Sequence, residues 1–201
     1  SGDTEVGIAT DGDKYTRTGE IALAQQFGKH SLMLGMGYSI SDNQGLMQFT
    51  RARIPSRTID LQERRRDVFG YLYLNPHSDI SLTLGLGRLY YDSQEEGLPN
   101  FDIVRFAPKF GLVWDVTAAT TVRLAAFSEL KRPLDILSVE PTQVAGFGQI
   151  FDDANGAKSN NVGLGIDAQP AKHVFAGIEY RYRDLNNPAI SPIEMSFDQR
   201  I

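Results

Sequence analysis

The chain has no cysteine among its 201 residues. Disulfide bridges, thiolate metal sites and cysteine nucleophiles are therefore excluded. It also lacks any run of about 18 consecutive apolar residues, which excludes a transmembrane helix. A transmembrane β-barrel stays open, because its apolar face is carried by alternate residues. The formal charge of −5 argues against a nucleic-acid partner.

What the chain does have is alternation of apolar with small or polar residues, clearest over residues 80–87. One face of that segment carries Ile80, Leu82, Leu84 and Leu86, and the other carries Ser81, Thr83, Gly85 and Gly87. A period of two predicts a β-strand with different surroundings on its two sides. Similar stretches recur at lengths of about ten residues, which suits a tilted strand crossing a bilayer.

Alternation and turn residues predict about nine strands within a single domain, residues 1–201. They are Thr4–Thr10, Tyr15–Phe27, Ser31–Ile40, Asp67–Leu74, Ile80–Tyr91, Asp102–Val116, Thr120–Leu130, Asn160–Asp167 and His173–Arg183. A turn is expected at Asp11–Asp13, and long loops at about 41–66 and 131–159, although part of the first loop could extend the flanking strands. Short and long connections alternate, as in an up-and-down outer-membrane barrel. A soluble β-sandwich has no reason to keep this alternation.

Aromatic residues of the apolar parity gather near predicted strand ends. Phe27 and Trp114 lie beside short turns, whereas Tyr38, Tyr90, Tyr180 and Tyr182 lie at the far ends. This is the arrangement of two interfacial girdles, although Tyr and Trp also simply favour strands. The residues predicted to face lipid are Leu82, Leu84, Leu86, Leu112, Trp114 and Tyr180.

The opposite parity holds glycines and charged residues, which would face a wet lumen in a barrel or bulk water in a sandwich. The predicted pore-lining charges are Lys109, Asp115, Arg123, Glu179, Arg181 and Arg183. Their expected role is selectivity through the local electric field, not catalysis.

Three groups of segments resemble a known family. They are 70–76; then 107–114 with 120–127 and 130–133; and 139–147 with 151–153. Together they look like the C-terminal barrel of outer-membrane proteins with tetratricopeptide repeats, over roughly residues 65–185. The middle group is also similar to two strands of TonB-dependent receptors, although Val139–Thr142 replaces the receptors' Asn-Pro-x-Leu-x-Pro-Glu element. An odd count of about nine strands, where bacterial barrels have even numbers, predicts a part of a larger barrel.

Other candidate sites are weighed against plainer interpretations. His30, His77 and His173 lie at predicted short turns; a metal-binding rim is one interpretation, and ordinary turn residues are the one we favour. Asp152–Gly156 resembles the start of a calcium loop, but a turn is favoured. The basic group of the first long loop could contact lipopolysaccharide phosphates or an anionic substrate, but a solvated loop balanced by nearby carboxylates is favoured; its members are Arg51, Arg53, Arg57, Arg64, Arg65 and Arg66. Residues 144–151 are expected either to form a short strand or to fold into the lumen as a constriction.

The sequence therefore predicts an all-β, antiparallel, up-and-down transmembrane barrel, or part of one, in the bacterial outer membrane. The predicted function is a pore for passage or export of a polar solute or polymer. The alternatives are a structural or adhesive protein with a closed lumen, a TonB-dependent receptor fragment and, ranked last, a soluble β-sandwich binding module. No Gly-x-Ser-x-Gly nucleophile motif is present, so no enzyme and no cofactor are expected. Outer-membrane lipid or lipopolysaccharide, a periplasmic protein and a missing barrel segment are the expected partners.

Overall fold

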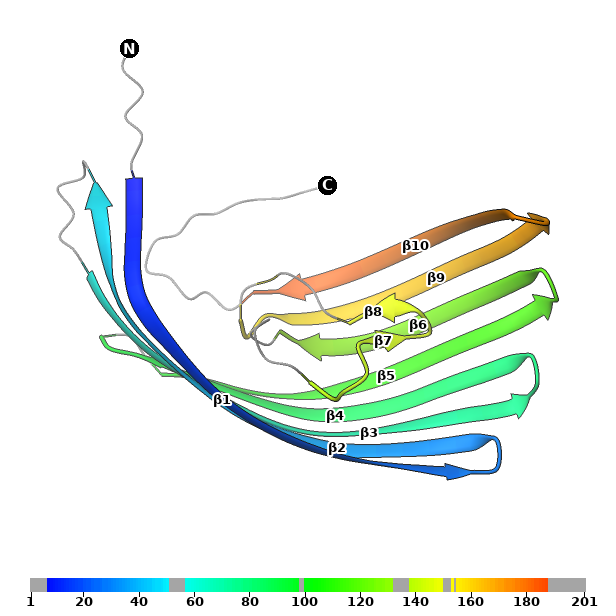
Figure 1. Cartoon of the computed structure of the whole chain (residues 1–201), viewed down its shortest axis with the longest axis horizontal. Helices are drawn as coiled ribbons and strands as arrows, with labels where there is room; N and C mark the ends of the chain where they lie inside the picture. The colour runs from blue at the N-terminus through cyan, green and yellow to red at the C-terminus, as the bar shows by residue number, and fades with distance from the viewer. Residues whose placement is uncertain are drawn as a thin grey trace, which may run out of the picture.

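Eight long strands form one antiparallel sheet in this computed structural model, which describes residues 7–50, 57–97, 100–131, 138–149, 153 and 155–187. Their order across the sheet is β1 (Gly7–Phe27), β2 (His30–Thr50), β3 (Arg57–His77), β4 (Ile80–Glu95), β5 (Phe101–Thr117), β6 (Thr120–Leu130), β9 (Lys158–Ala171) and β10 (Val174–Asn186). A small hairpin, β7 (Gln143–Val144) and β8 (Phe147–Gly148), lies on the concave side of the curved sheet (Figure 1). No described helix is long and apolar enough to cross a membrane.

The topology is up-and-down, because each strand of the large sheet pairs with its neighbour in the sequence once the small hairpin is set aside. Residues 28–29, 78–79, 118–119 and 172–173 make the short turns, and Figure 1 shows these turns together at one end of the sheet. The longer connections lie at the other end. The predicted all-β, antiparallel up-and-down fold is confirmed.

The prediction of a turn at Asp11–Asp13 is wrong, because β1 runs straight through it. Gly12 pairs with Gly45 of β2, and a β-carbon added at Gly12 would lie 2.6 Å from the Gly45 Cα. The two glycines thus allow a backbone approach that side chains would block. An Asp-Gly-Asp triplet favours a turn locally, but the long pairing with β2 decides the outcome.

The first predicted long loop, 41–66, is also mostly strand. Residues 41–50 continue β2 and residues 57–66 begin β3, with register kept from Ser31↔Tyr73 to Met47↔Arg57. Residues 51–56, including Arg51 and Arg53, lie outside the described part. The segment is mostly polar, and its few apolar residues keep no steady alternation, so the sequence pattern is too weak to reveal a strand.

The two faces of the sheet differ as predicted from the period of two. Leu84, Leu86 and Tyr180 point to the convex side, with 42%, 54% and 63% of their surface exposed. Trp114 is also exposed there, and Leu82 and Leu112, which are register partners, are partly buried. The alternate residues Tyr71, Leu89 and Ala107 are buried on the concave side.

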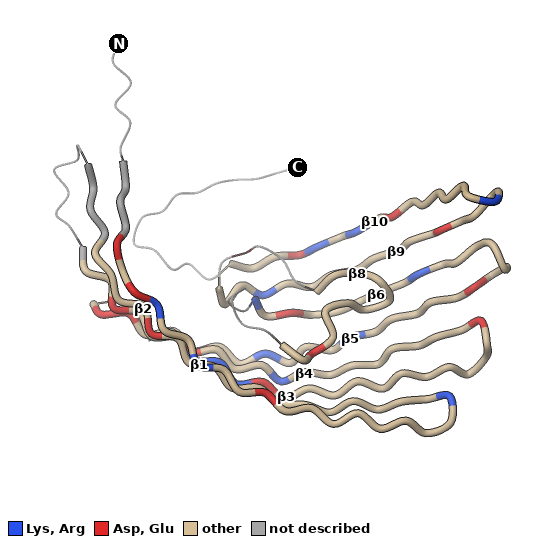
Figure 2. Tube along the Cα trace, in the orientation of Figure 1, with Lys and Arg blue, Asp and Glu red and all other residues tan. Residues whose placement is uncertain are grey.

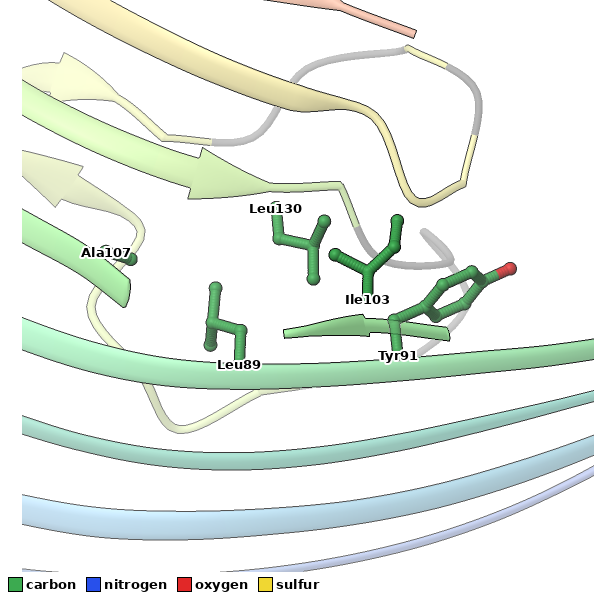
Figure 3. Close-up of a cluster of buried hydrophobic side chains, with 5 residues drawn as sticks. All are labelled: Leu89, Tyr91, Ile103, Ala107 and Leu130. Atoms are coloured by element: carbon green, nitrogen blue, oxygen red, sulfur yellow. The ribbon is translucent and has the colours of Figure 1, made fainter. Parts of the chain in front are cut away.

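The concave side is more apolar than the sequence indicates. Leu89, Tyr91, Ile103, Ala107 and Leu130 from β4, β5 and β6 form one buried cluster, toward the end with long connections (Figure 3). A second cluster joins Ala125 and Phe127 of β6 to Val144 and Phe147 of the small hairpin. These side chains are buried because part of the β6–β9 connection folds back over them.

The sheet is open within the described residues. β1 pairs with β2 alone and β10 pairs with β9 alone, so each leaves one hydrogen-bonding edge. β1 runs toward the short-turn end and β10 runs away from it (Figure 1), so the two edge strands are antiparallel to each other.

Candidate functional site

Residues 138–149, here called the strap, cross the concave face nearly from edge to edge. At one side the Val139 amide donates to Glu20 Oε2 of β1 at 2.6 Å. In the middle Glu140 accepts a hydrogen bond from Tyr71 Oη of β3 at 2.8 Å. At the far side the Arg181 guanidinium of β10 lies 5.4 Å from the centre of the Phe147 ring. The strap therefore links strands that are distant in the sheet.

Lys109 of β5 contacts the strap near both of its ends, at Glu140 and at Gln149. Its ammonium is fully buried and forms ion pairs with Glu129 of β6 and with Glu140, the latter at 3.4 Å. It also donates to the side chain of Gln149, the last residue of the strap. A buried charge is tolerated only when it is paired and hydrogen-bonded, so these partners explain how a lysine can be enclosed here.

Further hydrogen bonds join the end of the strap to residues near its beginning. The side-chain Nε2 of Gln149 donates to the Pro141 carbonyl at 2.7 Å, and the backbone amide of Gln149 donates to the Thr142 carbonyl at 2.9 Å. The tight turn between β7 and β8 places Ala145 and Gly146 in the left-handed region, with φ of 49° and 83°. The result is a compact loop that is closed on itself and fixed to the wall.

Glycines of the wall form recesses that receive the strap. A β-carbon added at Gly111 would lie 2.8 Å from Val144 Cγ1, and one added at Gly163 would overlap the Phe147 ring. Val144 and Phe147 are 0% and 2% exposed. The concave-face glycines thus allow close packing between strap and sheet.

Gly163→Ala is expected to push Phe147 out of its recess and to cost about 1–3 kcal/mol of stability, because the added methyl overpacks the contact. Chymotrypsin, which cleaves after phenylalanine, should then cut at Phe147 in the assembled protein. Gly87→Ala is the matched control on the same face, since its new methyl would meet nothing closer than the Ala107 Cβ at 3.6 Å. Equal protection of both variants would contradict the seated position of Phe147.

Three of the predicted pore charges come together beneath the strap. Arg123 lies 5.0 Å from the Phe147 ring centre and pairs with Asp167 at 2.6 Å and with Glu179 at 3.3 Å. Arg181 also pairs with Glu179. The cluster joins β6, β9, β10 and the strap.

The other three predicted charges are placed apart. Lys109 has the expected parity, but the strap covers it completely, so its contacts are those of an anchor. Arg183 pairs with Asp153 of the β6–β9 connection. Asp115 is exposed near the short-turn end and accepts a hydrogen bond from Thr121 Oγ1 at 2.6 Å. Contact of any of these residues with a passing solute stays a prediction.

Sequence reasoning missed most partners of the strap. Glu129 could have been found from register, because Lys109 pairs with Phe127 and residue 129 is its diagonal neighbour on the same face. Tyr71 lies in the same row as Lys109, because Tyr71 pairs with Gly85 of β4 and Gly85 pairs with Lys109. Glu140 and Gln149 carry no such signal, since they belong to no strand of the large sheet. Residues 144–151 are expected either to form a short strand or to fold into the lumen as a constriction. The described part, 144–149, contains β8 and the end of β7, and the constriction stays a prediction.

The remaining candidates have ordinary partners. His77 pairs with Asp79, and the Ser78 hydroxyl, followed by His77, lowers the pKa of the Asp79 carboxyl from its usual value. No group of three or more potential metal ligands occurs in the described ranges. In the predicted Asp152–Gly156 turn, Asp153 pairs with Arg183 and Asn155 donates to Glu63, while Asp152 and Ala154 lie outside the described residues.

Comparison with known proteins gives structural neighbours only. No protein-family model matches the chain, and no curated protein matches it. The ferripyoverdine receptor of the outer membrane of Pseudomonas aeruginosa superimposes with a TM-score of 0.64, at 17% identity, over 90% of this chain and 26% of the receptor. The ferric-catecholate import receptor Fiu of E. coli gives 0.56, at 10% identity, over 90% and 32%. The ferric preacinetobactin receptor BauA of Acinetobacter baumannii gives 0.51, at 13% identity, over 81% and 27%.

The chain thus spans about a quarter to a third of the length of these structures. At such low identity the likeness concerns the fold alone. The resemblance to barrels with tetratricopeptide repeats is tested by none of these matches and stays a prediction. The described strands therefore share the fold of part of the chain of outer-membrane receptors.

Proposed function

We propose that this chain forms a sector of a transmembrane β-barrel in a bacterial outer membrane, and that the barrel passes a polar solute or polymer. The observation that carries the proposal is a two-faced sheet with an exposed apolar outer side and its short turns at one end. In water, so large an apolar face would remain uncovered. The structural neighbours are receptors, one of them an import receptor, which supports transport and a non-enzymatic role.

The height of the apolar band supports a bilayer. Trp114 pairs with Ile80 at the short-turn end, and Tyr90 lies ten residues further along β4. Ten residues span about 33 Å along a strand, and a tilt of about 45° reduces this to about 23 Å. That height is close to the roughly 25 Å apolar band of outer-membrane barrels.

The strap supports a barrel wider than eight strands. An eight-stranded barrel has an interior that side chains alone can fill. Here an additional loop of residues 138–149 lies against the concave face, and β1 and β10 keep their outer edges. We infer that further strands complete the wall and that the strap narrows the lumen they enclose.

Single-channel recording of the full-length protein in planar bilayers tests the pore. Discrete conductance steps are expected, and replacing residues 139–149 with a Gly-Ser linker should enlarge them, because the strap would no longer occupy the lumen. An inserted, heat-modifiable barrel without any conductance would overturn the pore and favour the structural or adhesive alternative.

A cysteine pair tests whether the strap is a fixed constriction or a mobile gate. The chain has no native cysteine, and a β-carbon added at Gly111 would lie 3.2 Å from the Ala145 Cβ, a little less than the roughly 3.5–4.5 Å between the β-carbons of a disulfide, so a small outward shift would let the bridge form. Because the strap is anchored at several points, oxidation of Gly111→Cys/Ala145→Cys is expected to leave conductance unchanged. A large conductance that appears only after reduction would instead show a gate.

A ferric-siderophore receptor is the second candidate, favoured by the shared fold of the three solved receptors. Quenching of the single tryptophan, Trp114, by ferripyoverdine at nanomolar concentration would favour it over a general pore.

A further inference from the structure

The convex face carries arginines where a lipid-facing wall should change to water. Going away from the short turns, residues 80–87 of β4 and 68–76 of β3 carry no charge (Figure 2). The first outward charges on these strands are Arg88 and Arg66. Arg66 lies level with Tyr90, its register partner, and Arg88 lies two residues closer to the short turns. Because an arginine within the apolar band is costly, these arginines mark the zone in which that band ends.

Aromatic rings hold both arginines at this level. The Arg66 and Arg88 guanidinium carbons lie 5.5 and 5.0 Å from the centre of the Tyr90 ring, and that of Arg88 lies 5.3 Å from the centre of Phe106. The aromatic rings anchor at an interface, and the guanidinium groups are pre-positioned on their faces. Two cations thus flank one tyrosine across β3 and β4.

The charges follow an order along the strands. Asp92 on β4 and Asp102 on β5 are register partners. Asp92 lies two residues further from the short turns than Tyr90, the register partner of Arg66, and four residues further than Arg88. Arg66 pairs with Asp92 at 3.0 Å but keeps 58% of its side chain exposed. Arg88 is exposed and has no ion pair with any described residue. Arg66 and Arg88 are therefore the outward charges next to the apolar band on these strands, and the row beyond Tyr90 holds Arg64 together with Asp92 and Asp102.

We propose that Arg66 and Arg88, with Tyr90 and Phe106, bind the phosphate group of a lipid in the outer leaflet, of the lipid A class. A guanidinium binds phosphate through two parallel hydrogen bonds, and acyl chains would lie on the apolar face directly below, along Leu84 and Leu86. The inference rests on the proposed transmembrane role. A phosphate with attached acyl chains is favoured over free phosphate, because the site borders the apolar band.

The test measures binding of bisphosphorylated lipid A to the full-length protein in detergent by native mass spectrometry. Arg66→Gln/Arg88→Gln is expected to weaken binding about tenfold or more, since two charge-assisted contacts are lost. The control Lys29→Gln/Lys172→Gln removes two positive charges at the short-turn end and should bind as wild type. Inorganic phosphate at millimolar concentration should compete poorly.

Three outcomes would overturn the proposal: equal binding by the arginine variant and wild type, equal binding of dephosphorylated lipid A by wild type, or full competition by inorganic phosphate. The comparison of the two lipids on wild type does not depend on whether the variant folds. Failure of the transmembrane proposal would show separately, as a chain that stays monomeric in water and forms no heat-modifiable barrel in detergent.

Discussion

Replacing Lys109 with methionine is expected to lower the free energy of unfolding by about 3–5 kcal/mol. The ammonium is fully buried between Glu129 and Glu140, so its loss leaves two enclosed carboxylates without their shared cation. The strap should detach as well, because Lys109 also holds Gln149. Urea titration of the assembled full-length protein measures the loss, and the conductance should rise toward that of the strap deletion.

Two variants sharpen this result. Lys29→Met removes an exposed lysine that donates to the Pro76 carbonyl at 2.6 Å, and it should change stability little. Lys109→Met/Glu140→Gln also removes the charge of one of the two buried carboxylates, so it should recover part of the lost free energy of unfolding. Wild-type stability of Lys109→Met would show that the lysine is not the anchor of the strap.

Leu84→Arg should impair assembly in the membrane, at a cost of about 2–4 kcal/mol, because it places a charge on the lipid face near the midplane. Leu84 points to the convex side and lies between the Trp114 level and the Tyr90 level. Loss of the heat-modifiable band on gel electrophoresis, compared with wild type, reports the defect.

Thr83→Arg is the matched control, one residue away and on the concave side. Its charge can reach the lumen, so a much milder defect is expected. Equal defects at the two positions would contradict two differently solvated faces, and normal assembly of Leu84→Arg would contradict lipid contact at this site.

Particular residues show how far the sequence alone reaches. The alternation at Ile80–Gly87 predicted a strand and its two faces correctly, because side-chain direction in a strand depends only on position. The Asp11–Asp13 turn was predicted wrongly, because pairing with 21 residues of β2 overrides a local turn preference. The loop predicted at 41–66 proved to be mostly strand for a different reason, because its mostly polar sequence shows no steady alternation.

The candidate site was only partly predictable. The alternation of inward and outward residues correctly places Lys109 and Arg123 on the inner face. The burial of Lys109 beneath the strap, however, depends on contacts between segments that are distant in the sequence. Glu20 and Val139, and Tyr71 and Glu140, are 119 and 69 positions apart. No local pattern encodes such pairs, because they arise only when the register and the curvature of the sheet bring them together.

The sequence by itself determined the strand period, the apolar character of the outer face and the alternation of short with long connections. Each of these depends on residues that are near neighbours in the chain. Only the tertiary structure decided that residues 138–149 cross the concave face, that Gly111 and Gly163 receive Val144 and Phe147, and that Arg66 and Arg88 share Tyr90. The physical reason is that these contacts depend on the relative placement of whole strands, which is set by cooperative pairing across the sheet.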